Sequence, residues 1–117
     1  MRIEALSDTR QPVAWLRDLL SSLRKGLEST YGRRFRGLFL YGSMARGDDR
    51  VGSDVDVLIV LDEVPHYFEE LERTAQLVSD LSLAHDVTVS RTLMSVDQWE
   101  HGDEPFLTTV RRDAIAA

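Results

Sequence analysis

The fold of this chain is decided by residues 38–60, which read LFLYGSMARGDDRVGSDVDVLIV. The stretch holds two apolar runs with a glycine-rich and then acidic segment between them. Apolar runs of this length and composition are typical of buried β-strands, and they predict strands over 35–41 and 55–61. The glycines of 42–47 predict a turn that leads into a short helical segment, followed by a polar loop over 48–53.

Hydrophobic periodicity predicts the elements on either side. Apolar residues recur every three or four positions over 12–31 and 66–84, which indicates two long helices. Polar and apolar residues alternate over 86–94, which indicates a third strand with one open polar face. Two short helices are expected to follow, namely 95–99, where Ser95 and Gln98 form a capping box, and 105–115, which begins with a proline. This order predicts an α/β (α+β) fold, a small mixed β-sheet with helices mainly on one face.

Length and composition limit the function. A chain of 117 residues suits one domain, with a core over about 12–117 and an N-terminal arm over 1–11. A net charge of −6 disfavours direct nucleic-acid binding, because phosphate contacts need clustered Lys and Arg. The absence of cysteine excludes disulfides and Cys-ligated zinc. Without an apolar run of roughly 20 residues or a signal-peptide pattern, we expect a cytoplasmic protein that does not enter the membrane.

The residues between the two predicted strands suggest phosphate and metal chemistry. Gly42 allows close approach of the backbone to a ligand, and Ser43 offers a hydroxyl and an N–H at the start of a helical turn, where phosphate binds well. Asp54 and Asp56 are two residues apart at the start of a strand, so alternation directs both carboxylates to one face. Two such carboxylates favour a bridging cation, and oxygen ligands favour Mg²⁺ or Mn²⁺.

This segment resembles the signature of the nucleotidyltransferase superfamily that includes DNA polymerase beta. The signature joins a Gly-Ser turn to an S-D-x-D motif at the head of an apolar strand. Here it reads GSMARG over 42–47 and SDVD over 53–56. This form of the signature resembles that of the minimal nucleotidyltransferase branch, whose members include antitoxins.

The resemblance implies a role for each matching residue. Gly42, Ser43 and Ser53 would contribute to binding the nucleotide, and Arg46 would steady the turn or the phosphates. Asp54 and Asp56 would bind divalent ions, Mg²⁺ or Mn²⁺, with ATP or another nucleoside triphosphate as substrate.

The superfamily also uses a third carboxylate from a neighbouring strand, and the sequence leaves its position open. Asp86 is the candidate for this catalytic and metal-binding role, at the start of the predicted third strand. The family's acid commonly lies a few residues before the capped helix, and counting back from Ser95 places Ser90, which is not an acid, near that position. Asp86 and Ser90 would lie about 13 Å apart along a strand, so they are distinct positions.

The resemblance implies an enzyme that transfers a nucleoside monophosphate, AMP in particular, to an acceptor hydroxyl. Because little of the chain remains outside the catalytic core, we expect a partner protein to supply the acceptor. Minimal relatives act as antitoxins of small helical HEPN-type toxins, which makes such a toxin the expected partner. The alternative is a catalytically weak or inactive module of the same fold that neutralises a toxin by contact. Self-association into a homo-oligomer is also left open.

Overall fold

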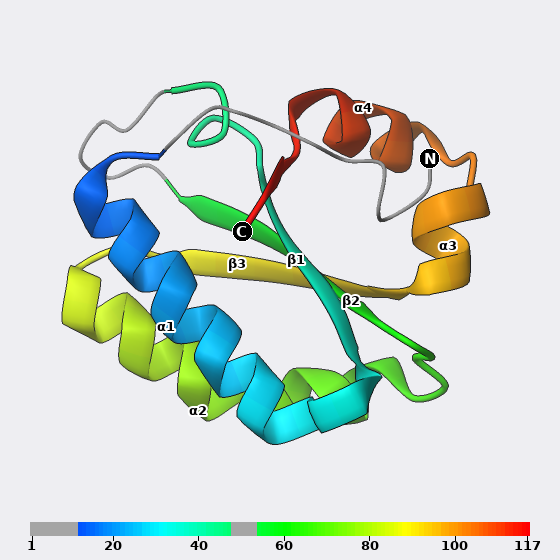
Figure 1. The fold of residues 1–117 in the computed structure, drawn as a ribbon, viewed down its shortest axis with the longest axis horizontal. Coiled ribbons are helices and arrows are strands. Elements are labelled where there is room, and N and C mark those ends of the chain that lie inside the picture. The colour runs from blue at the N-terminus through cyan, green and yellow to red at the C-terminus, as the bar shows by residue number, and fades with distance from the viewer. Residues whose placement is uncertain (1–11, 48–53) are drawn as a thin grey trace.

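The computed structural model describes residues 12–47 and 54–117 (Figure 1). Helices and strands follow one another in the predicted order, with one additional strand at the end. The elements are α1 (Ala14–Tyr31), the 3-10 turn η2 (Gly32–Arg34), β1 (Phe35–Tyr41), β2 (Val55–Leu61), α2 (Tyr67–His85), β3 (Val89–Ser95), α3 (Val96–His101), α4 (Pro105–Asp113) and β4 (Ile115–Ala116).

The strands form one mixed sheet in the order β3-β2-β1-β4. β1 is antiparallel to β2 and to β4, whereas β2 and β3 run parallel. The bounds predicted for β1 and β2 are confirmed residue for residue. β2 occupies the centre of the sheet, and all but one of its residues are buried, which explains its uninterrupted apolar sequence.

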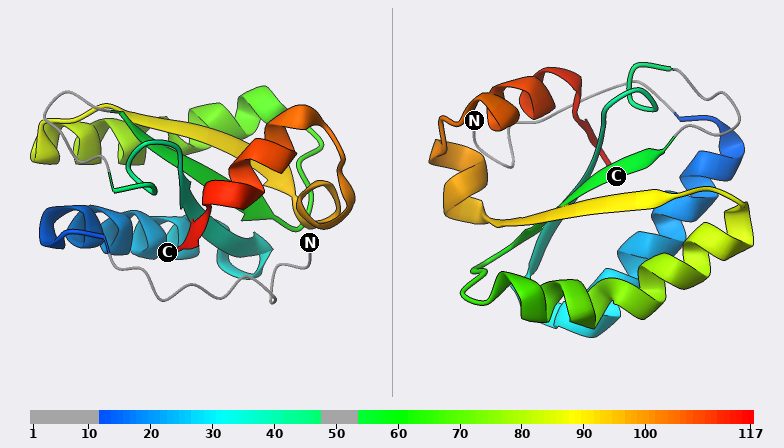
Figure 2. Two further views of the ribbon diagram at one scale, coloured as in Figure 1. Left: turned by 90° about the horizontal axis from the view of Figure 1, so that it is seen from above. Right: turned by 180° about the vertical axis from the view of Figure 1, so that it is seen from behind.

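Helices pack on both faces of the sheet. The two long helices, α1 and α2, share one face, and the two short helices, α3 and α4, lie against the other (Figures 1 and 2). The first core joins α1 leucines to alternate β2 residues, Val55, Val57 and Ile59. The second is built on Trp99, which stacks on Phe39 with ring centroids 4.8 Å apart. Within 12–47 and 54–117, no helix is both long and apolar enough to span a membrane.

The predicted start of the third strand is wrong by three residues. β3 begins at Val89, because α2 continues through His85 and ends on Asp86. Asp86 has a left-handed backbone, with φ of 53°, and its N–H bonds to carbonyls of the last helical turn. Aspartate tolerates this conformation better than most residues, so it ends the helix here. The polar and apolar alternation of 86–94 is therefore not evidence of extended structure over its first three residues.

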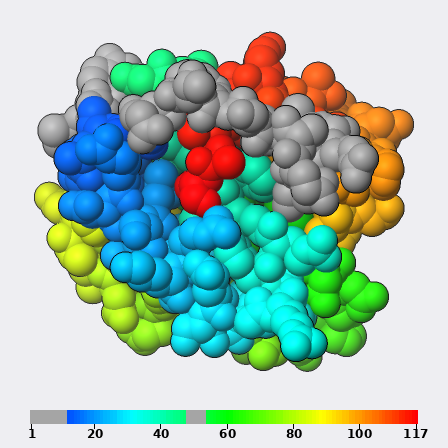
Figure 3. All heavy atoms as spheres, in the orientation of Figure 1, coloured from blue at the N-terminus to red at the C-terminus, as the bar shows by residue number. Residues whose placement is uncertain are grey.

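The last helix is also shorter than predicted. α4 ends at Asp113, and the chain then turns into β4, where Ile115 pairs with Leu40 of β1. In the space-filling view, this C-terminal segment is seated between α1 and β1 (Figure 3). The Arg24 guanidinium donates to the Ala117 carbonyl at 2.7 Å, which ties the segment to α1.

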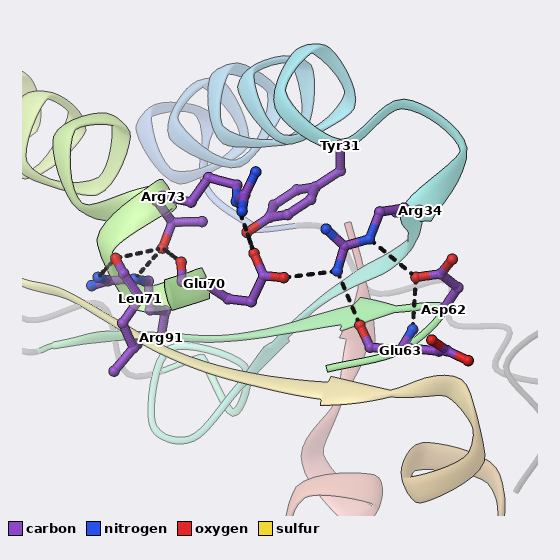
Figure 4. Close-up of polar contacts among 9 residues, drawn as sticks. Tyr31, Arg34, Asp62, Glu63, Glu70, Leu71, Arg73 and Arg91 are labelled. Atoms are coloured by element: carbon purple, nitrogen blue, oxygen red, sulfur yellow. Dashed lines mark hydrogen bonds and ion pairs between the residues drawn. The ribbon is translucent and has the colours of Figure 1, made fainter. Parts of the chain in front are cut away.

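A buried carboxylate joins α1, η2 and α2 (Figure 4), near the end of the sheet at which Phe35 pairs with Leu61. Glu70 is 4% exposed. Its oxygens accept hydrogen bonds from the Tyr31 hydroxyl at 3.0 Å and Arg34 Nη2 at 2.7 Å, and pair with Arg73 Nε at 3.0 Å. Burial alone raises the pKa of Glu70, but these donors and the two positive charges outweigh it, so the pKa lies below its ordinary value. Burial and the Glu70 contact raise the pKa of Tyr31 to about 12.

We expect Glu70→Gln to destabilise the protein by about 3 kcal/mol at pH 7, because it removes the charge that pairs with two arginines. The lowered pKa means that the wild-type carboxylate contributes stability above its ordinary pKa of 4.5 and loses it as the pH falls through the lower folded-state value. Urea unfolding at pH 7 and in acid should therefore show a difference between the two proteins that shrinks below pH 4.5.

The matched control is Glu69→Gln, since Glu69 is exposed and has no ion pair among the described residues. It should change stability by less than about 0.5 kcal/mol at either pH. An equal loss in the two variants would contradict the role given to Glu70.

Candidate nucleotide and metal site

The turn after β1 exposes backbone donors at the end of the sheet. The Gly42 carbonyl accepts from the N–H of Ala45 at 3.1 Å and of Arg46 at 3.3 Å, so the turn has helical hydrogen bonding without becoming a helix. The N–H groups of Ser43 and Met44 have no acceptor among the described residues. Unpaired N–H groups at the start of a helical turn attract anions, as the sequence predicts for Ser43.

Gly42 is required here by the adjacent carboxylate. Its φ is 76°, a conformation that L-residues with side chains rarely adopt. A Cβ atom at this position would lie 2.5 Å from Oδ2 of Asp56. The absence of a side chain thus lets the turn pass directly over the Asp56 carboxylate. The sequence identified the glycine, but it predicted close approach to a ligand and not to Asp56.

Asp56 is the half-buried centre of the site. It lies on β2 opposite Tyr41 of β1 and beside Ser90 of β3. Burial raises the pKa of Asp56, the negative charge of Asp54 raises it further, and the Arg46 guanidinium lowers it. Asp54 itself is exposed, immediately before the strand. The structure therefore brings together four predicted residues, Gly42, Arg46, Asp54 and Asp56.

This arrangement fits a divalent cation. The Asp56 carboxylate lies in a partly desolvated position beside a second negative charge, and a cation would relieve both penalties. The donors are carboxylate oxygens, which Mg²⁺ and Mn²⁺ prefer. Within 12–47 and 54–117, no three Asp, Glu or His side chains come together as a metal-binding group. The described part of the site therefore offers an aspartate pair.

Arg46 connects the turn to α4. Its Nη1 lies 2.7 Å from Oδ2 of Asp113, the last residue of that helix. Asp113 is largely buried, whereas about half of the Arg46 side chain is exposed. This ion pair ties the turn to α4, and the role of Arg46 toward the phosphates stays a prediction. Asp113 was not singled out from the sequence, because nothing in its sequence neighbourhood indicates a partner 67 residues away.

The remaining predicted residues lie apart from this group or outside the described residues. Asp86 is exposed at the C-cap of α2, three residues before β3, and Ser90 occupies the β3 position beside Asp56. Asp86 is predicted as the third carboxylate on a strand that begins at that residue. This strand start is wrong, because β3 begins at Val89. The catalytic role predicted for Asp86 is not tested by this geometry, and the Asp86→Asn variant tests it. Ser53 lies outside the described residues.

Aromatic and hydroxyl side chains extend the site along the sheet, and the sequence did not single them out. The Tyr41 hydroxyl lies 3.5 Å from Oγ1 of Thr92 on β3, so the tyrosine crosses the central strand. Phe106 of α4 meets the Tyr41 ring edge-on, with centroids 5.8 Å apart. Tyr41 and Asp56 are direct cross-strand partners, which places this group next to the aspartates.

Comparisons with a family model, with known proteins and with solved structures agree on one family. A model of the nucleotidyltransferase domain matches residues 20–105. Protein adenylyltransferase MntA of Thermococcus cleftensis is 31% identical over 80 residues, which cover 68% of this chain and 79% of that protein. A structure assigned as a minimal nucleotidyltransferase is 26% identical, with a TM-score of 0.59, and the match covers 92% of this chain and 98% of the other.

A toxin–antitoxin structure determined with AMP-PNP has the same fold. It is 17% identical, its TM-score is 0.59, and the match covers 82% of this chain and 69% of the other. The match to the domain model spans most of the chain and includes the Gly-Ser turn and both aspartates. This chain therefore belongs to the nucleotidyltransferase family, as the motif at 42–56 predicts.

Proposed function

We propose that this chain transfers AMP from ATP to a hydroxyl group of a partner protein, with Mg²⁺ or Mn²⁺ as the required ion. The observation that carries the proposal is the Asp54–Asp56 pair beneath the Gly42 turn. The similarity to protein adenylyltransferase MntA supports a protein as the acceptor. A toxin–antitoxin structure of the same fold supports a toxin as that protein, for which a small HEPN-type toxin is our candidate.

Each residue of the site has a defined task in this proposal. The free N–H groups at Ser43 and Met44 receive the triphosphate tail. Arg46, fixed by Asp113, holds the turn in place and adds positive charge. Asp54 and Asp56 hold the divalent ion, which supplies the positive charge that offsets the phosphates. Gly42 lets the turn approach the Asp56 carboxylate closely, so the N–H groups that would receive the phosphates lie near the residues that would hold the ion.

The absence of an acid at Ser90 favours a second function, neutralisation of a toxin by contact. Ser90, a neutral residue, lies beside Asp56, and the described residues hold no third acid in this group. A site of this kind would still bind a metal–nucleotide complex. It would position an acceptor hydroxyl poorly. The chain would then silence its toxin by contact, with the nucleotide as a structural ligand.

Two measurements on the wild-type protein separate these functions. Calorimetry with ATP should show much tighter binding in Mg²⁺ than in chelator, because carboxylate and phosphate charges otherwise repel. The protein is then incubated with ATP, Mg²⁺ and the protein encoded by the adjacent reading frame. Intact mass should show added AMP on that partner. Binding and silencing of the partner without added mass would favour the contact mechanism, and equal ATP affinity with and without Mg²⁺ would contradict both.

A further inference from the structure

One exposed aromatic residue adjoins the site without serving the core of its own helix. The buried side of α4 is formed by Leu107, Val110 and Asp113. Phe106 is 43% exposed and contacts Tyr41 with its ring perpendicular to that of the tyrosine. Exposing half of a phenylalanine next to a functional group is unfavourable in water, so a ligand that covers it would gain free energy.

The two ends of α4 match the two ends of a nucleotide, which has charged phosphates at one end and a flat base at the other. Residues seven apart lie on nearly the same side of a helix and about 10 Å apart along it. Asp113, at one end of α4, holds Arg46 of the turn that we propose receives the phosphates. Phe106, at the other end, lies beside Tyr41, and Tyr41 is the cross-strand partner of Asp56. The helix therefore has a charged end at the phosphate turn and an aromatic end beyond the aspartates.

We propose that Phe106, supported from the side by Tyr41, is the stacking surface for the nucleobase of the bound nucleoside triphosphate. This inference rests on the proposed binding of the triphosphate at the Gly42 turn and the aspartate pair. A flat aromatic ring stacks on any base, so it adds affinity with little selectivity. The Ser90 and Thr92 hydroxyls on the same side of β3 offer polar contacts for the sugar or base between the metal site and the ring.

The test compares two ligands that share the phosphates and differ in the base. Binding of ATP and of inorganic tripolyphosphate is measured by calorimetry in Mg²⁺ for the wild type, Phe106→Ala and Phe106→Leu. Both variants should bind ATP about tenfold more weakly, because stacking on one base contributes about that factor. Both should bind tripolyphosphate as the wild type does. Phe106→Leu keeps an apolar side chain, so it covers the case in which the alanine variant unfolds.

The matched control is Phe68→Ala on α2, where the phenylalanine is 79% exposed and contacts Tyr67 edge-on. It should leave the affinity for both ligands unchanged. Unaltered ATP affinity in Phe106→Leu would overturn the inference while leaving the proposed function intact. Loss of AMP transfer to the partner with unaltered ATP affinity would also overturn it, and would assign Phe106 to partner contact. If neither ligand binds the wild type in Mg²⁺, the proposed function fails and the inference fails with it.

Discussion

Replacing Asp56 by Asn is expected to lower the rate of AMP transfer by about 10³-fold, because a metal-held charge contributes several kcal/mol to the transition state and each 1.4 kcal/mol is a factor of ten. Asparagine keeps the size of the side chain and removes the negative charge that holds the ion. The same change relieves the desolvation and repulsion that raise the pKa of Asp56, so the metal-free variant should fold at least as well as the wild type. Single-turnover transfer and urea unfolding in chelator measure the two effects.

Asp86→Asn is the decisive companion variant. Asparagine is well suited to the left-handed conformation at Asp86, so the C-cap of α2 should be preserved. Because Asp86 is exposed and precedes β3, whereas Ser90 lies beside Asp56, we expect transfer within about threefold of the wild-type rate. A loss as large as that of Asp56→Asn in a folded protein would restore Asp86 as the third carboxylate. An active Asp56→Asn variant would refute the metal role of Asp56.

Trp99→Ala is expected to destabilise the fold by about 3–5 kcal/mol, the usual cost of removing a large buried aromatic side chain. Trp99 is 0% exposed and stacks on Phe39, and the Arg111 guanidinium lies 5.5 Å from its ring centroid. It fixes α3 to the sheet and stands at the centre of the core beneath α4. Urea unfolding followed by circular dichroism measures the loss.

Trp99→Phe should cost much less, about 1.5 kcal/mol, because phenylalanine still stacks on Phe39 and leaves a smaller cavity than alanine. The indole Nε1 has no hydrogen-bond partner among the described residues, so phenylalanine removes a buried unpaired donor. Equal losses in the two variants would show that the indole itself, and not the aromatic stacking, is what the core requires.

The central strands and the nucleotide motif follow from local sequence. β1 and β2 are predicted with their observed bounds, because short apolar runs rich in aromatic or branched side chains and bounded by turn residues favour buried strands. The capping box of Ser95 and Gln98 forms as expected, since both partners lie within one helical turn. The family also follows from residues 42–56, because two short motifs at a fixed separation constrain the chemistry more than either does alone.

Features that depend on distant partners required the tertiary structure. The start of β3 depends on where α2 ends, and a single aspartate in a left-handed conformation decides this against the alternating pattern. The contact between Arg46 and Asp113 joins residues far apart in sequence, as does the edge-on packing of Tyr41 and Phe106. Local propensity carries no information about such pairs.

The sequence by itself thus determined the central strands, the two aspartates, the turn over 42–47 and the family, since each is written in a contiguous segment. The tertiary structure decided which β3 residue stands beside Asp56, why residue 42 must be glycine, and which side chains border the site. The physical reason is that strand register and helix packing are set by the whole core, and a shift of one residue in β3 would exchange its two faces.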